Sequence, residues 1–288
     1  MDRLQQVYLG RLEAIVLYGS VFALYAGASL LWSNTDLSYS SAYLAALIVS
    51  FVLGYYLKTL RWIWVGYIFL VGILLALALT IGPIIGPNIF GAVAAVALAG
   101  ALAYGLWPLL PIPLAALAFS QSRGAVLGAS VAIILFLWER SKFLAYITFL
   151  LSTIVIVTVK NDLDASFLSR FGIWQDTINH LTVFGHGFGS FLETYRGFEV
   201  RTNMFNVLAP HAYNDFLEVV SDLGIGAVAL WFLIAACMED VGARTRLIIF
   251  TFFALSLTFF PLYIPIVGHL FALTLGHAAQ TKRTVRYG

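Results

Sequence analysis

Long apolar runs alternate with short polar segments along almost the whole chain. A helix needs about 20 mainly apolar residues to cross a bilayer, within a range of roughly 17–25. The pattern predicts about ten spans, over residues 14–32, 41–57, 62–80, 88–106, 107–121, 124–138, 143–159, 215–237, 247–262 and 263–280. We therefore expect an all-α polytopic membrane protein in which residues 1–288 form a single transmembrane domain.

One long polar interval, residues 160–212, separates the seventh and eighth predicted spans. Within it, apolar side chains recur at steps of three and four, as on one face of a helix. They are Phe171, Trp174, Ile178, Leu181 and Phe184, with Gln175, Asp176, Asn179 and His180 on the other side. The pattern predicts an amphipathic helix that begins near Ser169, ends near Gly185 and lies on the membrane surface with its apolar face down.

Composition and charge support a membrane protein and orient it. The chain is 61% hydrophobic and 10% charged, against about 45–50% and about 25% in soluble domains. Cytoplasmic loops carry an excess of Lys and Arg, and 11 of the 16 lie inside if the N-terminus is cytoplasmic. This places both termini in the cytoplasm and the 160–212 loop outside, and the net charge of +2 gives no sign of nucleic-acid binding. The alternative for the first span is a signal sequence, since Ala26-Gly27-Ala28 resembles a cleavage site.

Two arginines on the predicted outer side are candidates for binding a ligand. Arg123 lies between two apolar spans with almost no loop around it. An arginine near hydrocarbon is costly and usually faces a polar cavity or a partner, although snorkelling to headgroups is the alternative. Arg170 begins the predicted surface helix, and its alternative is an ordinary solvated charge.

His211 and three acids lie at the start of the eighth predicted span. His211 is at the expected boundary between water and membrane, where a histidine can exchange protons, although a structural role is the alternative for a lone histidine. Asp215, Glu218 and Asp222 follow at spacings that put them on one helix face. Asp215 and Glu218 can be explained by the positive end of the helix dipole. Asp222 would lie about 10 Å deeper than Asp215, where an acid needs a partner, and we expect an outer arginine.

Three glycines lie in the stretch GHGFGSF, which precedes His211 in the chain. Gly185, Gly187 and Gly189 permit tight turns and a close approach of backbone to ligand, although a simple turn back to the membrane is the alternative. His180 and His186 lack Cys or carboxylate neighbours at recurring metal-binding spacings. We predict neither a metal ion nor a cofactor.

Three stretches resemble the O-antigen ligase and O-antigen polymerase family of bacterial membrane proteins. They are SRGA (Ser122 to Ala125), SRFGIW through GHGFGSF (Ser169 to Phe191), and HAYNDFLEVVSDLGIGA (His211 to Ala227). The family often has His-x-His-Asn at the start of the third stretch, and here Tyr213 stands at the second histidine. The resemblance extends over about residues 110–280.

The resemblance implies a fold of the glycosyltransferase C type in the bacterial inner membrane, with the active site facing the periplasm. It implies a metal-independent inverting transfer from an undecaprenyl-pyrophosphate-linked glycan to the hydroxyl of lipid A core or of another glycan. Arg123 and Arg170 would bind the diphosphate, and His211 would be the general base. Tyr213, which stands where the family more often has its histidine, is the alternative proton acceptor. The same stretches imply substrate binding by Tyr213, Asn214, Asp222, Gly187 and Gly189.

Several functions remain open at this stage. A ligase, a polymerase and a protein-directed oligosaccharyltransferase share the same pattern. A transporter or channel for a lipid-linked or small anionic substrate is the alternative class, and it predicts interrupted helices with ionisable groups near the membrane midplane. A membrane scaffold predicts that Arg123, Arg170 and His211 are dispensable.

The charge distribution yields a direct test of topology. A cysteine at Asn203, in a variant in which Cys237 is replaced, is expected to react with an impermeant thiol reagent in intact spheroplasts. The reason is that the 160–212 loop lies outside if Lys and Arg follow the cytoplasmic excess. Labelling that appears only after lysis would contradict both the topology and an active site on the outer face.

Overall fold

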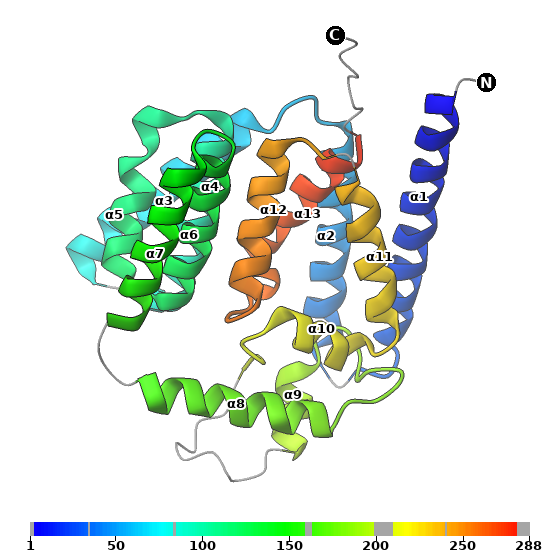
Figure 1. Cartoon of the computed structure of the whole chain (residues 1–288). Coiled ribbons are helices and arrows are strands. Elements are labelled where there is room, and N and C mark those ends of the chain that lie inside the picture. Colours follow the sequence, from blue (N-terminus) through cyan, green and yellow to red (C-terminus); the bar gives the residue numbers. More distant parts are fainter. Residues whose placement is uncertain are drawn as a thin grey trace. The chain divides into compact units, whose positions relative to one another are not determined.

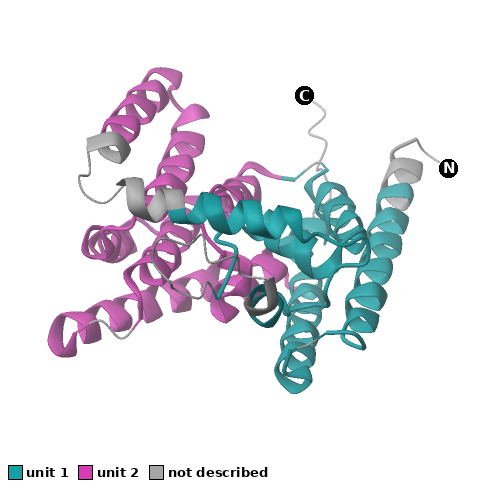
Figure 2. Ribbon diagram, turned by 90° about the horizontal axis from the view of Figure 1, so that it is seen from below, with its two compact units in different colours: residues 1–56, 162–241, 275–288 teal, residues 57–161, 242–274 magenta. Residues whose placement is uncertain are grey.

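A computed structural model describes residues 3–33, 35–82, 85–158, 163–198, 210–239 and 241–280, and these form helices without a strand. Lys160, Arg201 and Asn203 lie outside the described residues. The chain forms two compact units (Figure 2). Unit 1 comprises Met1–Tyr56, Asp162–Val241 and Leu275–Gly288, and unit 2 comprises Leu57–Asn161 and Gly242–Thr274.

Each predicted span contains apolar helix, which confirms the all-α class for the described residues (Figure 1). The elements are α1 (Arg3–Ser29), α2 (Leu37–Tyr56), α3 (Arg61–Ile81), α4 (Pro87–Tyr104), the 3-10 turn η1 (Trp107–Leu109), α5 (Pro111–Ser120), α6 (Arg123–Trp138), α7 (Lys142–Thr158), α8 (Leu163–Asn179), α9 (Phe191–Phe198), α10 (Asp215–Leu223), α11 (Gly226–Met238), α12 (Ala243–Ser256), η2 (Pro261–Tyr263) and α13 (Pro265–Gln280).

Five segments among the described residues are long and apolar enough to cross a membrane. They are Gly10–Ser29, Leu37–Tyr56, Arg61–Ile81, Pro87–Tyr104 and Asp215–Met238. The other five predicted spans contain helices of 10 to 17 residues. The helices indicate a membrane protein, and the count of ten spans stays a prediction.

Unit 2 is built around α4, which contacts α3, α5, α6 and α12. Its sequence is mostly Ala, Gly, Val and Leu, and small residues let helix backbones approach closely. A Cβ at Gly100 would lie 2.1 Å from the Trp64 ring of α3, and one at Gly91 would lie 2.7 Å from the Ala125 Cβ of α6. The small side chains of α4 therefore set the spacing of the helices around it.

In unit 1 the helix predicted over residues 215–237 changes direction at Gly224. α10 ends at Leu223 and α11 begins at Gly226, and α10 runs crosswise to α11 (Figure 1). Gly224 has a φ of +52°, a left-handed conformation that glycine adopts without steric cost. The segment predicted as one span therefore consists of two helices that are joined by a turn at Gly224.

The predicted surface helix is present as α8, with different bounds and a different buried face. It spans Leu163–Asn179, so it begins before Ser169 and ends before Phe184. Phe171 and Ile178 are exposed, as expected of an apolar face turned to lipid, and α8 runs crosswise to α1 (Figure 1). Asp176, expected on the water side, is buried and accepts a hydrogen bond of 3.5 Å from the Tyr195 hydroxyl of α9. Burial raises the pKa of Asp176, and the Tyr195 hydrogen bond opposes that rise.

A buried arginine joins three helices at one end of unit 1. Arg11 of α1 donates from Nε to Ala236 O at 3.1 Å, and from Nη2 to Cys237 O at 3.0 Å and Ala278 O at 3.1 Å. These carbonyls belong to the last turns of α11 and α13, where backbone acceptors lack helical partners and the helix dipole favours a cation. Arg11 therefore caps two helix C-termini at once.

Arg11→Leu is expected to lower the free energy of unfolding by about 2–4 kcal/mol, because buried carbonyls lose charge-assisted hydrogen bonds. Thermal unfolding of the purified chain in detergent measures the loss. The matched control is Arg61→Leu, since Arg61 is an exposed first residue of α3. Equal effects of the two substitutions would contradict the capping role.

Candidate active site

The site begins with a capped helix N-terminus in unit 1. Asn214 is the N-cap of α10: its backbone is extended and its side chain accepts a hydrogen bond of 3.1 Å from Leu217 N. Asparagine is among the preferred N-cap residues because it satisfies an amide that the helix leaves unpaired. The cap fixes the point at which the chain turns from residues 211–213 into α10.

His211 forms a dyad with Glu218 across this turn. His211 Nδ1 lies 2.7 Å from Glu218 Oε1, and Ala212 N donates to Glu218 Oε2 at 2.8 Å. The Glu218 side chain is 1% exposed and the His211 side chain 25% exposed. A carboxylate only accepts hydrogen bonds, so Nδ1 carries the proton and Nε2 is the ring nitrogen that can accept one. The imidazole is thereby oriented by a buried carboxylate, as a general base requires.

Arg170 and Tyr213 lie together beside this dyad. The Arg170 guanidinium carbon is 5.2 Å from the centroid of the Tyr213 ring, within the range of a cation–π interaction. Trp174, one turn further along α8, donates from Nε1 to Ala212 O at 2.8 Å. Burial lowers the pKa of Arg170, with Tyr213 opposing that shift, and an arginine stays protonated in proteins. α8 therefore supplies both a cation and a support for the 211–213 turn.

The glycine loop, residues 185–190, packs on the other end of α10. Gly189 N donates to Asp222 Oδ2 at 2.8 Å, and Gly187 N donates to the Asp222 carbonyl at 2.8 Å. Phe188 N donates to Ser29 Oγ at the end of α1, at 3.0 Å. Asp222 is fully buried, so the Gly189 amide provides a hydrogen bond that a buried carboxylate needs.

The glycines of this loop are required by contact with other parts of unit 1. A Cβ at Gly185 would lie 2.3 Å from Asp222 O, and one at Gly187 would lie 2.5 Å from Ser33 Cβ. Both residues have positive φ angles, +70° and +103°. Their amide contacts are to protein atoms in this structure, and the role of Gly187 and Gly189 in substrate binding stays a prediction.

Among the predicted catalytic residues, His211 and Arg170 belong to unit 1 and Arg123 to unit 2. His211, Tyr213 and Asn214 share one turn, and Arg170 reaches it from α8. Arg123 is the first residue of α6, after the N-cap Ser122, whose hydroxyl accepts from Ala125 N at 3.4 Å. The SRGA stretch is thus a helix start packed against Gly91 of α4.

Sequence reasoning missed Glu218 and Trp174 as members of the site. The helix dipole alone accounts for an acid at Glu218, so the sequence offered no reason to pair it with His211. The signal was the spacing of seven residues: a carboxylate in the second turn of α10 can reach back to the residues before the Asn214 cap. Trp174 was assigned to the apolar face, although an indole N–H that becomes buried needs an acceptor. No group of three or more His, Cys, Asp or Glu within the described part of the chain could hold a metal ion.

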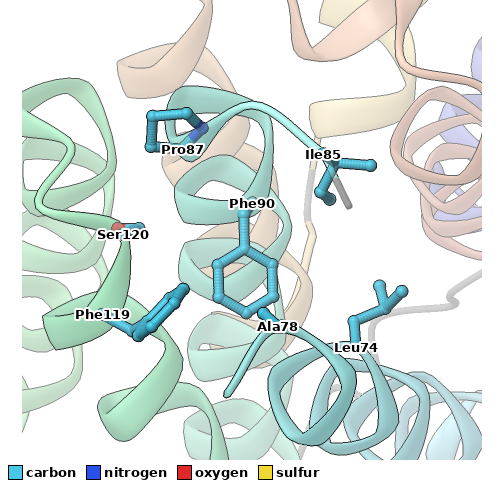
Figure 3. Close-up of a pocket in the computed structure, with 7 residues that line it drawn as sticks. All are labelled: Leu74, Ala78, Ile85, Pro87, Phe90, Phe119 and Ser120. Atoms are coloured by element: carbon cyan, nitrogen blue, oxygen red, sulfur yellow. The ribbon is translucent and has the colours of Figure 1, made fainter. Parts of the chain in front are cut away.

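Unit 2 contains a small apolar cavity. It has a volume of about 30 Å³ and is lined by Leu74, Ala78, Ile85, Pro87, Phe90, Phe119 and Ser120 (Figure 3). The rings of Phe90 and Phe119 meet edge to face, and the Ser120 hydroxyl donates to Leu117 O at 2.8 Å. A cavity of this size holds about two waters, which is too little for a sugar.

Gly224→Ala is expected to destabilise the chain by about 2 kcal/mol or more. An alanine at this positive φ angle is strained, and its Cβ would lie 2.2 Å from Val183 O. The control is Gly172→Ala in α8, where no atom outside the local helix lies within 4 Å. That substitution should be neutral or stabilise by up to about 1 kcal/mol. Thermal unfolding of both variants checks the prediction, and a neutral Gly224→Ala would contradict it.

Comparison with known proteins assigns no family to this arrangement. No protein-family model matches the chain, and no curated protein matches its sequence. The resemblance to O-antigen ligases and polymerases therefore stays a prediction, carried by the three stretches that include Arg123, Arg170 and His211.

Proposed function

We propose that the chain transfers a glycan from a polyprenyl-pyrophosphate carrier to an acceptor hydroxyl at the outer face of the bacterial inner membrane. The carrying observation is the His211–Glu218 dyad, in which a buried carboxylate binds Nδ1 of a partly exposed imidazole at 2.7 Å. Such a pair is suited to removing a proton from a hydroxyl group. The resemblance supplies the undecaprenyl carrier and an O-antigen ligase or polymerase as the type of transferase.

The transfer would be a single displacement at the anomeric carbon. The acceptor oxygen forms a bond to this carbon while the bond from carbon to diphosphate oxygen breaks, so the configuration inverts. The hydroxyl proton goes to His211 Nε2, and Glu218 stabilises the imidazolium that results. The electron pair of the broken bond leaves with the diphosphate, which remains on the lipid carrier. No metal ion or other cofactor enters this scheme.

Arg170 is the cation that would bind the leaving diphosphate. Its guanidinium reaches from α8 to within 5.2 Å of the ring centroid of Tyr213, on the turn that also carries His211. An arginine makes charge-assisted, paired hydrogen bonds to phosphate oxygens, and these strengthen as negative charge develops. The expectation that Arg123 also binds diphosphate rests on its sequence motif alone. The acceptor, lipid A core or a further glycan, would approach from the aqueous side.

The turn at Gly224 is the feature that favours the alternative, a transporter for a lipid-linked or small anionic substrate. Interrupted helices in transporters expose backbone groups to bind their cargo. Here, however, the backbone groups beside the turn bind protein: Gly224 N donates to Val220 O, and Ile225 N donates to Val183 O, both at 2.8 Å. We therefore prefer the transferase.

His211→Ala is expected to abolish transfer by purified protein given lipid-linked glycan and acceptor in detergent, because general-base catalysis contributes about 10²–10⁴-fold. Glu218→Gln should lower kcat by about tenfold or more while KM changes little, since it removes the charge that orients the base. In cells, a glycan-ladder gel should show the same order. His180→Ala, in the same polar region, is the control and should retain activity.

A transferase predicts product in detergent, where no compartment exists, whereas a transporter predicts none. Wild-type turnover that persists in both His211→Ala and Glu218→Gln would contradict the proposed base. Loss of core-linked glycan while lipid-linked polymer is still made would indicate a ligase, and loss of chain length alone would indicate a polymerase.

A further inference from the structure

Tyr213 has a backbone conformation that needs an explanation. Its φ is +53°, in the left-handed region that aromatic residues rarely occupy. Such a conformation costs free energy and persists only where the surroundings hold it, which is common at functional sites. Asn214, its neighbour, is the N-cap of α10. The strained residue thus lies directly between the helix cap and the His211 turn.

The Tyr213 side chain is held by α8 and α9. It packs against a buried cluster of Ile173, Phe191, Tyr195 and Ala212. Phe191 and Tyr195 are stacked with ring centroids 5.5 Å apart, so two packed aromatic rings of α9 form part of this cluster. The left-handed turn therefore directs an aromatic ring into the α8–α9 packing, where its outer face is covered by the Arg170 guanidinium.

We propose that Tyr213 is a positioning residue whose ring holds the Arg170 guanidinium ready for the diphosphate of the lipid-linked donor. The inference rests on the proposed function and adds a residue that acts through Arg170 instead of on the substrate. An arginine side chain has many rotamers, and fixing it before binding reduces the entropy that binding must overcome. A carboxylate partner would neutralise the charge of the guanidinium. An aromatic face attracts the guanidinium and leaves its charge available for the diphosphate.

In this role Tyr213 supports Arg170 and does not accept a proton. A platform needs the ring face and not the hydroxyl, so Tyr213→Phe should preserve it. Tyr213→Asn removes the ring but suits the left-handed backbone, because asparagine is among the residues enriched there. The two substitutions therefore separate the ring, the hydroxyl and the backbone turn.

Binding of geranylgeranyl pyrophosphate to the purified full-length chain in nanodiscs tests the inference, with geranylgeraniol as the control lipid that lacks the diphosphate. We expect Tyr213→Phe to bind the pyrophosphate within about twofold of wild type and Tyr213→Asn to bind it about tenfold more weakly, as expected when a cation–π contact to a partly buried cation is lost. Binding of geranylgeraniol should be unchanged in both. Arg170→Gln should weaken pyrophosphate binding, and combining it with Tyr213→Asn should add little, because the two residues act as one unit.

Each other outcome overturns a defined part of the argument. If Tyr213→Phe loses as much as Tyr213→Asn, the hydroxyl acts directly and the platform is wrong. If the losses from Tyr213→Asn and Arg170→Gln add fully, Tyr213 acts independently of Arg170 and the inference fails while the proposed function stands. If wild type binds the pyrophosphate no better than geranylgeraniol, the diphosphate donor fails, and the inference fails with it.

Discussion

The buried carboxylates of α10 determine how unit 1 is assembled. A buried carboxylate must be compensated by hydrogen bonds or charge, and Glu218 and Asp222 both receive backbone N–H groups from residues that precede α10 in the chain. Glu218 fixes the 211–213 turn at one end of the helix, and Asp222 fixes the glycine loop at the other. Removing Glu218 would leave the buried Ala212 amide without its acceptor, and removing Asp222 would do the same to the partly buried Gly189 amide. The 211–213 turn and the glycine loop therefore both depend on α10.

Buried polar groups are also compensated by hydrogen bonds at both ends of α1. Arg11 satisfies carbonyls at the ends of α11 and α13, while Ser29, 18 residues later, accepts a hydrogen bond from the glycine loop. At 1.5 Å per residue these two positions are about 27 Å apart, close to the roughly 30 Å hydrocarbon thickness of a bilayer. Arg11 and Ser29 thus make polar contacts near the two ends of α1.

The site combines rigidity with partial exposure. His211 is held by a buried acid, Tyr213 by an aromatic cluster and Ala212 by the Trp174 indole. Reactive groups work best when their supporting residues are fixed and the groups themselves remain accessible. Here three consecutive residues, 211–213, are each fixed by a different helix: α10, α8 and α9. The 211–213 turn is therefore more rigid than a loop without such contacts.

The sequence by itself determined the helical class, the positions of the apolar segments and the polar interval that contains the site. Hydropathy and helical periodicity are local properties, and burial in lipid requires backbone groups to be satisfied within a helix. The sequence also pointed to Arg170 as a cation on the expected outer side, to His211 as a histidine just before an apolar run and, through the resemblance, to Asn214. Only the tertiary structure decided the partners: Glu218 for His211, the Gly189 amide for Asp222, and the Tyr213 ring for Arg170. It also placed Asp176 inside the protein and bent the α10–α11 segment at Gly224. These features depend on contacts between residues far apart in the chain, such as Gly189 with Asp222 or Trp174 with Ala212, and no local pattern specifies which of several possible partners a buried polar group will meet.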